Sequence, residues 1–198
     1  MKYLRHLLLV AIITVMLVSN AFAQPVEYKI DKSHSNIGFV VKHLVITKVR
    51  GDFQKYDAQL FYDEKDITKS SVDVTIDVAS IDTENERRDN HLRSGDFFDA
   101  ENNPQITFKS TSFGKDGDQL YAMGNLTIRG VTKEVKLPFE MTEKIVDPWG
   151  NTRFGVEASL EINRFDYGVK KKKKMDTGGL VVSEEVKIEI QLEAVEKK

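Results

Sequence analysis

The 198-residue sequence contains no cysteine, and it has no long apolar run beyond its first 23 residues. The first absence excludes disulfide bonds and a lipid-attachment cysteine, so the chain has to be stabilised by its hydrophobic core. The second argues against a membrane-spanning helix in the rest of the chain. A strong excess of one charge is also missing, because 29 Lys and Arg residues stand against 31 Asp and Glu residues. That balance argues against nucleic acid as the main partner.

The N-terminal segment has the features of an export signal. Two basic residues precede a nearly continuous apolar run at residues 7–18, and an A-x-A sequence follows at residues 21–23. The apolar run is too short to cross a bilayer comfortably. We therefore predict that residues 1–23 are a signal peptide and that residues 24–198 form a single domain of an exported protein. Such a signal is compatible with the periplasm and with the external medium.

Alternation of apolar and polar residues dominates the remaining sequence. In residues 72–78 every second residue is valine or isoleucine, and the same period recurs in residues 135–141 and 186–194. A period of two is typical of half-buried antiparallel strands, whereas buried parallel strands are continuously apolar. A change of parity near Lys55 and Tyr56 indicates a bulge or bend. The predicted fold class is therefore all-β, with an antiparallel sheet closed on itself around an apolar interior.

One segment, residues 82–99, departs from this pattern. Thr83-Glu84-Asn85-Glu86 fits a capping box, in which a threonine hydroxyl and a glutamate satisfy the first backbone N–H groups of a helix. Gly95 is a plausible end. We predict one short helix at about residues 84–94. Because its surface is polar nearly all round, we expect it near a barrel end rather than in the core.

Several short motifs occur in order along the chain. They are Asp31-x-x-His34-Ser35-x-Ile37-x-Phe39, Gly51-x-Phe53, Arg88-Asp89-x-His91-Leu92, Asp96-Phe97-Phe98-Asp99, Gly124-x-Leu126-Thr127-Ile128-Arg129-Gly130 and Asn163-Arg164-x-Asp166-x-Gly168. Taken together, they resemble the YceI-like family of bacterial exported polyisoprenoid-binding proteins. The resemblance spans essentially the whole chain after residue 23. Two positions depart from it: Tyr28, where a tryptophan is common, and a lysine run at residues 170–174.

The resemblance implies a lipocalin-like barrel of eight antiparallel strands with a long apolar pocket. It implies that the pocket holds a polyprenyl chain, such as an isoprenoid quinone or a polyprenyl phosphate, and it favours the periplasm. It implies no enzyme activity and no cofactor. Residue types alone leave a packed core and a container equally open, because small residues beside large ones fit either. The resemblance favours the container.

We expect the ligand to contact inward-facing apolar side chains and a few polar groups near the helix. The candidate ligand-binding residues are Ile37, Phe39, Val41, His43, Phe53, Arg88, His91, Leu92, Phe98, Phe108, Leu126 and Phe154. Burial is worth roughly 0.8 kcal/mol for each CH₂ group, so a tail of several isoprene units can bind tightly without specific polar contacts.

Each polar candidate also has an alternative, structural role. His43 follows the parity of the inward residues, so it either meets a ligand headgroup or is a satisfied core histidine. His91 either donates to a quinone carbonyl or a phosphate, or it fixes the helix to the barrel. Arg88 can pair with a phosphate, unless Glu84 and Asp89 already hold it.

An enzyme is the main rival hypothesis. The sequence contains no G-x-S-x-G or H-E-x-x-H motif. His34, His43 and His91 are far apart and lack the spacing of a metal site, so we expect no bound metal. A small catalytic or metal site would have to combine an inward His43 with His91. A filled barrel that binds no small molecule is the third alternative.

Two further features concern structure and partners. Arg164 and Asp166 are expected to lock a strand end. The lysine run is expected to be an exposed loop, which is either simply solvated or touches an anionic membrane surface transiently. It comprises Lys170, Lys171, Lys172, Lys173 and Lys174. The sequence leaves the oligomeric state open, a homodimer included.

Overall fold

The computed structural model describes residues 24–44, 46–169 and 181–198, so the predicted signal peptide and the lysine run lie outside it. One α-helix, α2 (Glu86–Arg93), and several one-turn 3-10 helices interrupt the strands of the described chain. No helix within these residues is long and apolar enough to cross a membrane. The strands are β1 (Val26–Ile30), β2 (Asn36–His43), β3 (Thr47–Phe53), β4 (Tyr56–Tyr62), β5 (Ser71–Asp77), β6 (Ile81–Asp82), β7 (Gln105–Asp116), β8 (Gln119–Ile128), β9 (Val131–Met141), β10 (Ile145–Val146), β11 (Thr152–Asn163) and β12 (Val182–Glu196).

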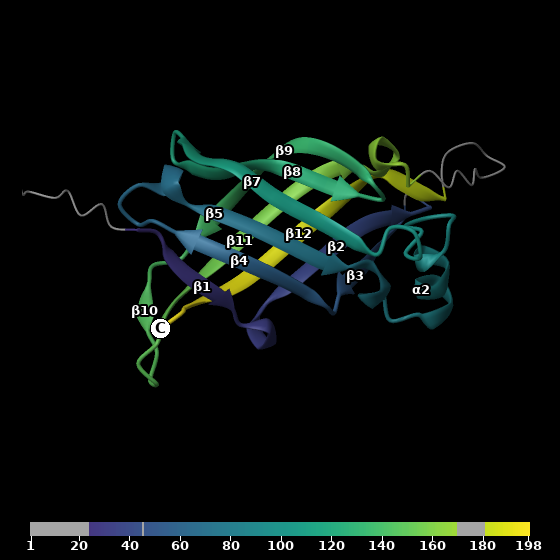
Figure 1. The fold of residues 1–198 in the computed structure, drawn as a ribbon. Helices are drawn as coiled ribbons and strands as arrows, with labels where there is room; N and C mark the ends of the chain where they lie inside the picture. Colours follow the sequence, from purple (N-terminus) through teal and green to yellow (C-terminus); the bar gives the residue numbers. More distant parts are fainter. Residues whose placement is uncertain (1–23, 45, 170–180) are drawn as a thin grey trace, which may run out of the picture.

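The strands close into an antiparallel barrel (Figure 1). Eight of them form the ring in the order β11-β9-β8-β7-β5-β4-β1-β12, and the pairing of β12 with β11 completes it. That last pairing is long, running from Arg153 opposite Val195 to Asn163 opposite Glu185. The predicted fold class is confirmed.

Three positions of the ring contain two strands that follow one another in sequence. β2 continues β1 along the same edge of β12, β3 precedes β4, and β6 follows β5. The break between β3 and β4 falls at Gln54 and Lys55. Their backbone N–H groups donate to the backbone oxygen of Ser80 (3.1 Å) and to its hydroxyl (3.0 Å) instead of to a neighbouring strand. The predicted bend is therefore confirmed.

Register places the apolar residues of neighbouring strands on one inner face. Ile188 of β12 lies opposite Phe39 of β2 on one side and Leu160 of β11 on the other, and all three line the interior. β7 departs from simple alternation, because its register with β8 shifts between Ser110 and Ser112. The bulge changes which residues of β7 face inward. Phe108 before it and Phe113 after it both line the cavity, although simple alternation would place them on opposite faces.

The helix prediction needs a correction. α2 begins at Glu86, and its N-cap is Asn85, whose side-chain oxygen accepts from the Arg88 backbone N–H at 3.0 Å. The expected capping box at Thr83 is wrong, because Glu84 has a φ of +61°, outside the helical region. The helix ends at Arg93 with Ser94 as its C-cap, one residue before Gly95.

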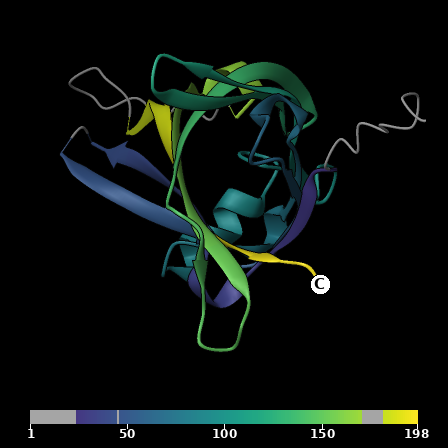
Figure 2. The same cartoon turned by 90° about the vertical axis from the view of Figure 1, so that its left-hand side faces the viewer.

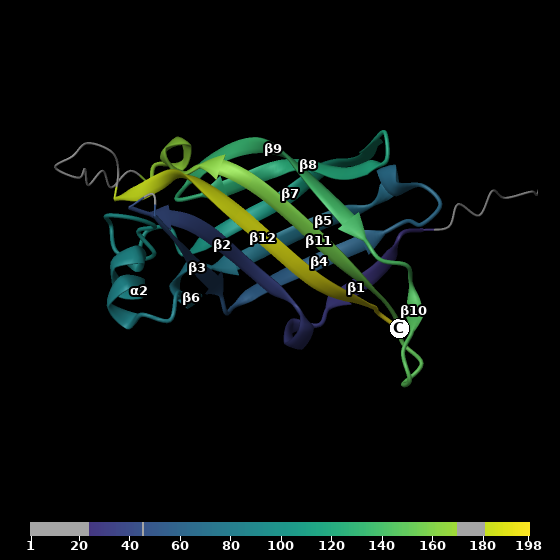
Figure 3. The same cartoon turned by 180° about the vertical axis from the view of Figure 1, so that it is seen from behind.

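The two ends of the barrel differ. Figure 2 looks along the barrel and shows α2 lying across its far end, as predicted. Figure 3, the view from behind, places β10 at the opposite end. Near β10 the rings of Tyr28, Tyr62 and Phe154 pack edge to face or tilted, with the Tyr28 and Phe154 centroids 4.8 Å apart. The polar helix and the aromatic cluster thus occupy opposite ends.

Candidate ligand-binding cavity

A cavity of about 590 Å³ occupies the inside of the barrel. Side chains from strands all around the ring line it, and so do residues of α2 and of the segments on both sides of that helix. Pockets of roughly 300–1,000 Å³ are typical of small-molecule sites. The barrel is therefore not filled by its own side chains, so the geometry favours the container over the packed core.

The described part of the lining is apolar and lacks acidic side chains. Among the described residues around the cavity there is no aspartate or glutamate. The aromatic members are Phe39, Phe53, Tyr62, Phe97, Phe98, Phe108, Phe113, Phe139, Phe154 and Tyr167. Its titratable nitrogen groups belong to His43, Arg88, His91 and Arg164. Such a lining suits a long apolar molecule that carries at most one polar or anionic end.

All twelve candidate residues of the sequence lie at this cavity. They are Ile37, Phe39, Val41, His43, Phe53, Arg88, His91, Leu92, Phe98, Phe108, Leu126 and Phe154. Their contact with a ligand stays a prediction. Three lining residues that the sequence pattern did not reveal show the limits of pattern reading. Phe113 is hidden by the β7 bulge, Tyr167 belongs to a 3-10 turn without periodicity, and Val169 follows that turn.

Two glycines explain how large rings leave the lumen open. A Cβ atom on Gly51 would lie 2.6 Å from the Phe39 ring, and one on Gly124 would lie 2.5 Å from the Phe108 ring. Each ring therefore lies over a glycine of the neighbouring strand, against the wall. The pairing of small with large residues, which the sequence left ambiguous, thus helps to keep space inside the barrel.

Arg88 stands at the helix end of the cavity and is held by Thr83. Its Nε donates to Thr83 Oγ1 at 2.7 Å, and its Nη2 donates to the Thr83 backbone oxygen at 2.6 Å. Thr83 in turn donates its backbone N–H (3.0 Å) and its hydroxyl (2.5 Å) to buried Asp89. The sequence offered Glu84 and Asp89 as partners of Arg88. In the described residues Thr83 holds the guanidinium instead. Within the described residues, Nη1 has no hydrogen-bond partner and is available to a ligand.

The two cavity histidines differ in their partners. The His91 Nε2 atom lies 3.1 Å from an Asp96 carboxylate oxygen, and its ring packs edge-on against Phe97. These contacts favour the helix-fixing role for His91. His43 ends β2 opposite Val182, and its ring makes no hydrogen bond to another described residue. The structure thus does not show a satisfied core histidine at His43.

The expected strand lock is present at Arg164. This buried guanidinium donates to three backbone oxygens: those of Ser183 (2.8 Å), Val169 (2.7 Å) and Val182 (3.3 Å). It joins the turn after β11 to the start of β12, and burial lowers its pKa. Asp166 pairs instead with Lys133, at 3.6 Å.

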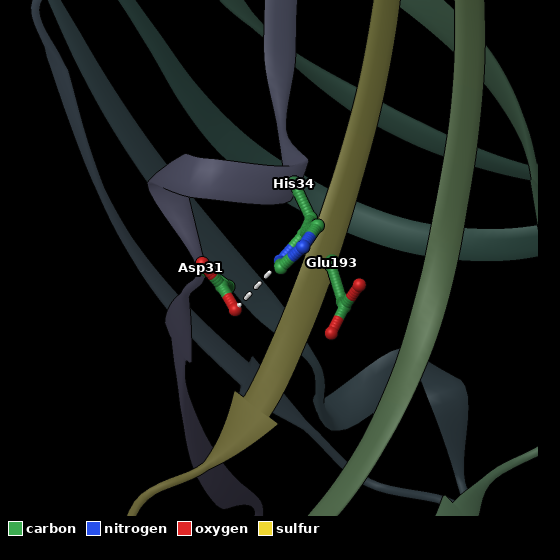
Figure 4. A group of neighbouring side chains, drawn as sticks. All are labelled: Asp31, His34 and Glu193. Atoms are coloured by element: carbon green, nitrogen blue, oxygen red, sulfur yellow. Dashed lines mark hydrogen bonds and ion pairs between the residues drawn. The ribbon is translucent and has the colours of Figure 1, made fainter.

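A metal site of three histidines is not formed. Within the described residues, the one group of potential metal ligands whose atoms lie within 4.8 Å of one another is Asp31, His34 and Glu193 (Figure 4). The guanidinium of Arg153 already pairs with both carboxylates, at 3.4 Å from Asp31 and closer to Glu193. The cluster is therefore an ion-pair network. None of its members lines the cavity.

The match to known proteins agrees with this geometry. The model of the YceI-like domain matches residues 28–194. The chain belongs to the YceI-like family. The protein YceI of Escherichia coli O157:H7 is 40% identical over 185 residues, which are 92% of this chain and 94% of that protein.

Two solved structures share the barrel. BcnA of Burkholderia cenocepacia superposes with a TM-score of 0.73 at 28% identity, covering 83% of this chain and 98% of that chain. A polyisoprenoid-binding domain from Saccharophagus degradans has a TM-score of 0.63 at 15% identity, covering 87% and 99%. At that low identity the second likeness shows the fold alone. The predicted membership of the YceI-like family is confirmed.

Proposed function

We propose that this YceI-like protein binds a polyisoprenoid lipid and holds its tail inside the barrel. The observation that carries the proposal is the apolar cavity of about 590 Å³, whose described lining contains no carboxylate. The Saccharophagus degradans neighbour, which shares this fold, is described as a polyisoprenoid-binding domain, and we propose the same ligand class for this chain. The proposed activity is binding, not catalysis.

Apolar burial supplies most of the affinity in this proposal. Each CH₂ group removed from water contributes roughly 0.8 kcal/mol, so several isoprene units outweigh the ordering of a flexible chain. The aromatic walls and the aliphatic residues between them offer contact along the whole tail. Few specific contacts are needed, which suits a ligand built from identical units.

The helix end of the cavity is the proposed place of the headgroup. Among the described residues, neither Arg88 Nη1 nor the His43 ring has a hydrogen-bond partner. Both groups can donate to an oxygen, whether it belongs to a quinone carbonyl or to the phosphate of a polyprenyl phosphate. The tail then extends toward the aromatic cluster of Tyr28, Tyr62 and Phe154.

A periplasmic carrier or store of isoprenoid lipid is the proposed setting, with protection against stress as a further role. The export signal predicted at residues 1–23 supports it. In the same setting we propose that the lysine run at residues 170–174 attracts the protein to anionic membrane surfaces, at up to about 1 kcal/mol per lysine at low salt. Val169 and Val181, the described residues on either side of the run, both line the cavity.

Filling the cavity tests the proposal. Ala158 on β11 lines the cavity, so Ala158→Phe should occupy space that the tail needs. We expect the amount of isoprenoid quinone that remains bound through purification, measured by organic extraction, to fall at least about tenfold, because several methylene contacts are lost. Ala79→Phe, at an exposed position, is the matched control and should retain the ligand. Equal retention by both variants, with unchanged circular dichroism, would contradict binding in the barrel.

A further inference from the structure

The 145–149 turn, which consists of β10 and the first residues after it, carries exposed apolar side chains at the end of the barrel opposite α2. Ile145 is 60% exposed, Val146 71% and Trp149 76%. They account for three of the five exposed large hydrophobic residues in the described chain, and they fall within five consecutive positions. Figures 1 and 3 show this turn projecting beyond the barrel. Clustered apolar exposure on a projecting tip indicates an interaction surface.

The backbone N–H groups of residues 147–151 are already paired within the turn. The N–H of Asp147 donates to the Asn151 oxygen (2.9 Å), and the N–H of Gly150 donates to the Asp147 oxygen (2.9 Å). The N–H groups of Trp149 and Asn151 donate to the Asp147 carboxylate at 2.9 and 2.8 Å. Pro148 has no N–H group. Every backbone donor from 147 to 151 is therefore paired, so moving the tip out of water leaves none of these N–H groups without a partner.

The tip carries little unpaired charge. Asp147 is buried, and Arg153 Nη2 lies 2.7 Å from its carboxylate. At the foot of the turn, Lys144 pairs with Glu64 at 3.0 Å and extends over the Tyr62 ring. Lys198 donates to the Gly150 backbone oxygen at 3.0 Å. A tip whose one carboxylate is paired, with an exposed indole and nearby lysines, fits the interface of a lipid bilayer, where tryptophan is enriched.

The turn is also continuous with the cavity wall. It connects β9 to β11, and the lining residues nearest to it in sequence are Met141 and Phe154. A surface that held this turn would therefore lie next to one end of the cavity. A convex tip needs no complementary pocket in its partner, which favours a fluid bilayer over a folded protein.

We propose that the 145–149 turn inserts Ile145, Val146 and Trp149 into the interfacial region of a lipid bilayer and docks the barrel there. Docking is driven by apolar insertion, so it does not require anionic lipid. It differs in this respect from the electrostatic contact proposed for the lysine run.

Fluorescence gives a direct test, because Trp149 is the one tryptophan in the sequence. On adding phosphatidylcholine vesicles to the chain beginning at Gln24, we expect its emission to shift to the blue and its quenching by acrylamide to fall. Brominated lipids should quench it. In Ile145→Ser/Val146→Ser the vesicle affinity should fall at least about tenfold, because the burial of two aliphatic side chains is lost.

The controls separate this proposal from the others. Ile46→Ser, at an 81% exposed residue of the turn between β2 and β3, should bind vesicles like the unmodified chain. The Ile145→Ser/Val146→Ser variant should still retain isoprenoid, since neither residue lines the cavity. No spectral change with phosphatidylcholine would overturn the proposal. Binding restricted to anionic vesicles, abolished by salt and insensitive to the serine substitutions, would also overturn it and assign the contact to the lysine run.

Discussion

At the residue scale, Thr83 connects the cavity wall to α2 through a single hydroxyl group. The hydroxyl donates to buried Asp89 at 2.5 Å and accepts from Arg88 Nε at 2.7 Å. One side chain thus satisfies a buried carboxylate and orients the guanidinium proposed to meet the headgroup. The same threonine lines the cavity.

Thr83→Val keeps the shape of the side chain and removes both hydrogen bonds. We expect the free energy of unfolding to fall by about 1–3 kcal/mol, because the Asp89 carboxylate loses a donor in a buried setting. Urea denaturation measures this change. Thr127→Val is the control, since its exposed hydroxyl bonds only Thr132 among the described residues, and it should change the value by less than about 0.5 kcal/mol. Equal losses would refute the role given to Thr83.

The sequence identified Arg88 as a candidate ligand-binding residue, but the partners that it offered for Arg88, Glu84 and Asp89, are not the ones that the structure shows. Thr83-Glu84-Asn85-Glu86 fits a capping box, and a search for local pairs also joins Arg88 to Glu84. Only the fold shows that Asp89 is buried and turned toward Thr83. Sequence patterns report spacing along a helix, and they do not report which side of a helix meets the barrel.

Acid should weaken the ion-pair network outside the barrel. The pKa of Asp31 lies below its ordinary value, chiefly because the His34 ring donates a hydrogen bond to it. A carboxylate with a lowered folded-state pKa stabilises the fold above its unfolded pKa of about 3.9, and this contribution is lost as the pH falls through the folded value. Asp31→Asn should therefore flatten the dependence of unfolding free energy on pH between about 5 and 3. An identical slope in the variant would contradict this assignment.

At the element scale, the strands combine regular alternation with local exceptions. From Val186 to Leu192, β12 keeps a period of two, so its inward residues Val186, Ile188, Ile190 and Leu192 could be read from the sequence. β7 contains a bulge, and no residue type in Ser110-Thr111-Ser112 announces it. Phe113 was missed for this reason. Alternation identifies a face only as far as the next change of register.

Glycines in the barrel wall make room for aromatic rings. In Gly124→Ala the new Cβ would lie 2.5 Å from the Phe108 ring and 2.7 Å from the Lys109 backbone oxygen. Because the backbone atom cannot move aside easily, we expect a loss of about 1–3 kcal/mol in thermal or urea unfolding. Gly95→Ala adds a Cβ with one contact, at 3.9 Å, and should change stability by less than about 0.5 kcal/mol. Tolerance of alanine at Gly124 would show that the Phe108 ring is not fixed there.

At the scale of the whole molecule, closure of the ring decides what the protein can do. The sequence predicted the antiparallel barrel from the alternation of its strands. It predicted the end helix and twelve residues that line the cavity from this alternation together with the local pattern at residues 82–99 and the YceI-like motifs. Residue types alone left the filled barrel and the container open, and the family resemblance favoured the container. The choice depends on how Phe39 lies over Gly51 and Phe108 over Gly124, which is a property of register between strands.

Native mass spectrometry of the protein purified from its own host without detergent, followed by organic extraction, tests the central claim most directly. We predict a retained mass above that of the chain itself, which the extract resolves into an isoprenoid quinone or a polyprenyl phosphate. The bare chain mass, with no adduct after prenyl lipids are added, would contradict the proposal that the barrel is a container for isoprenoid lipid.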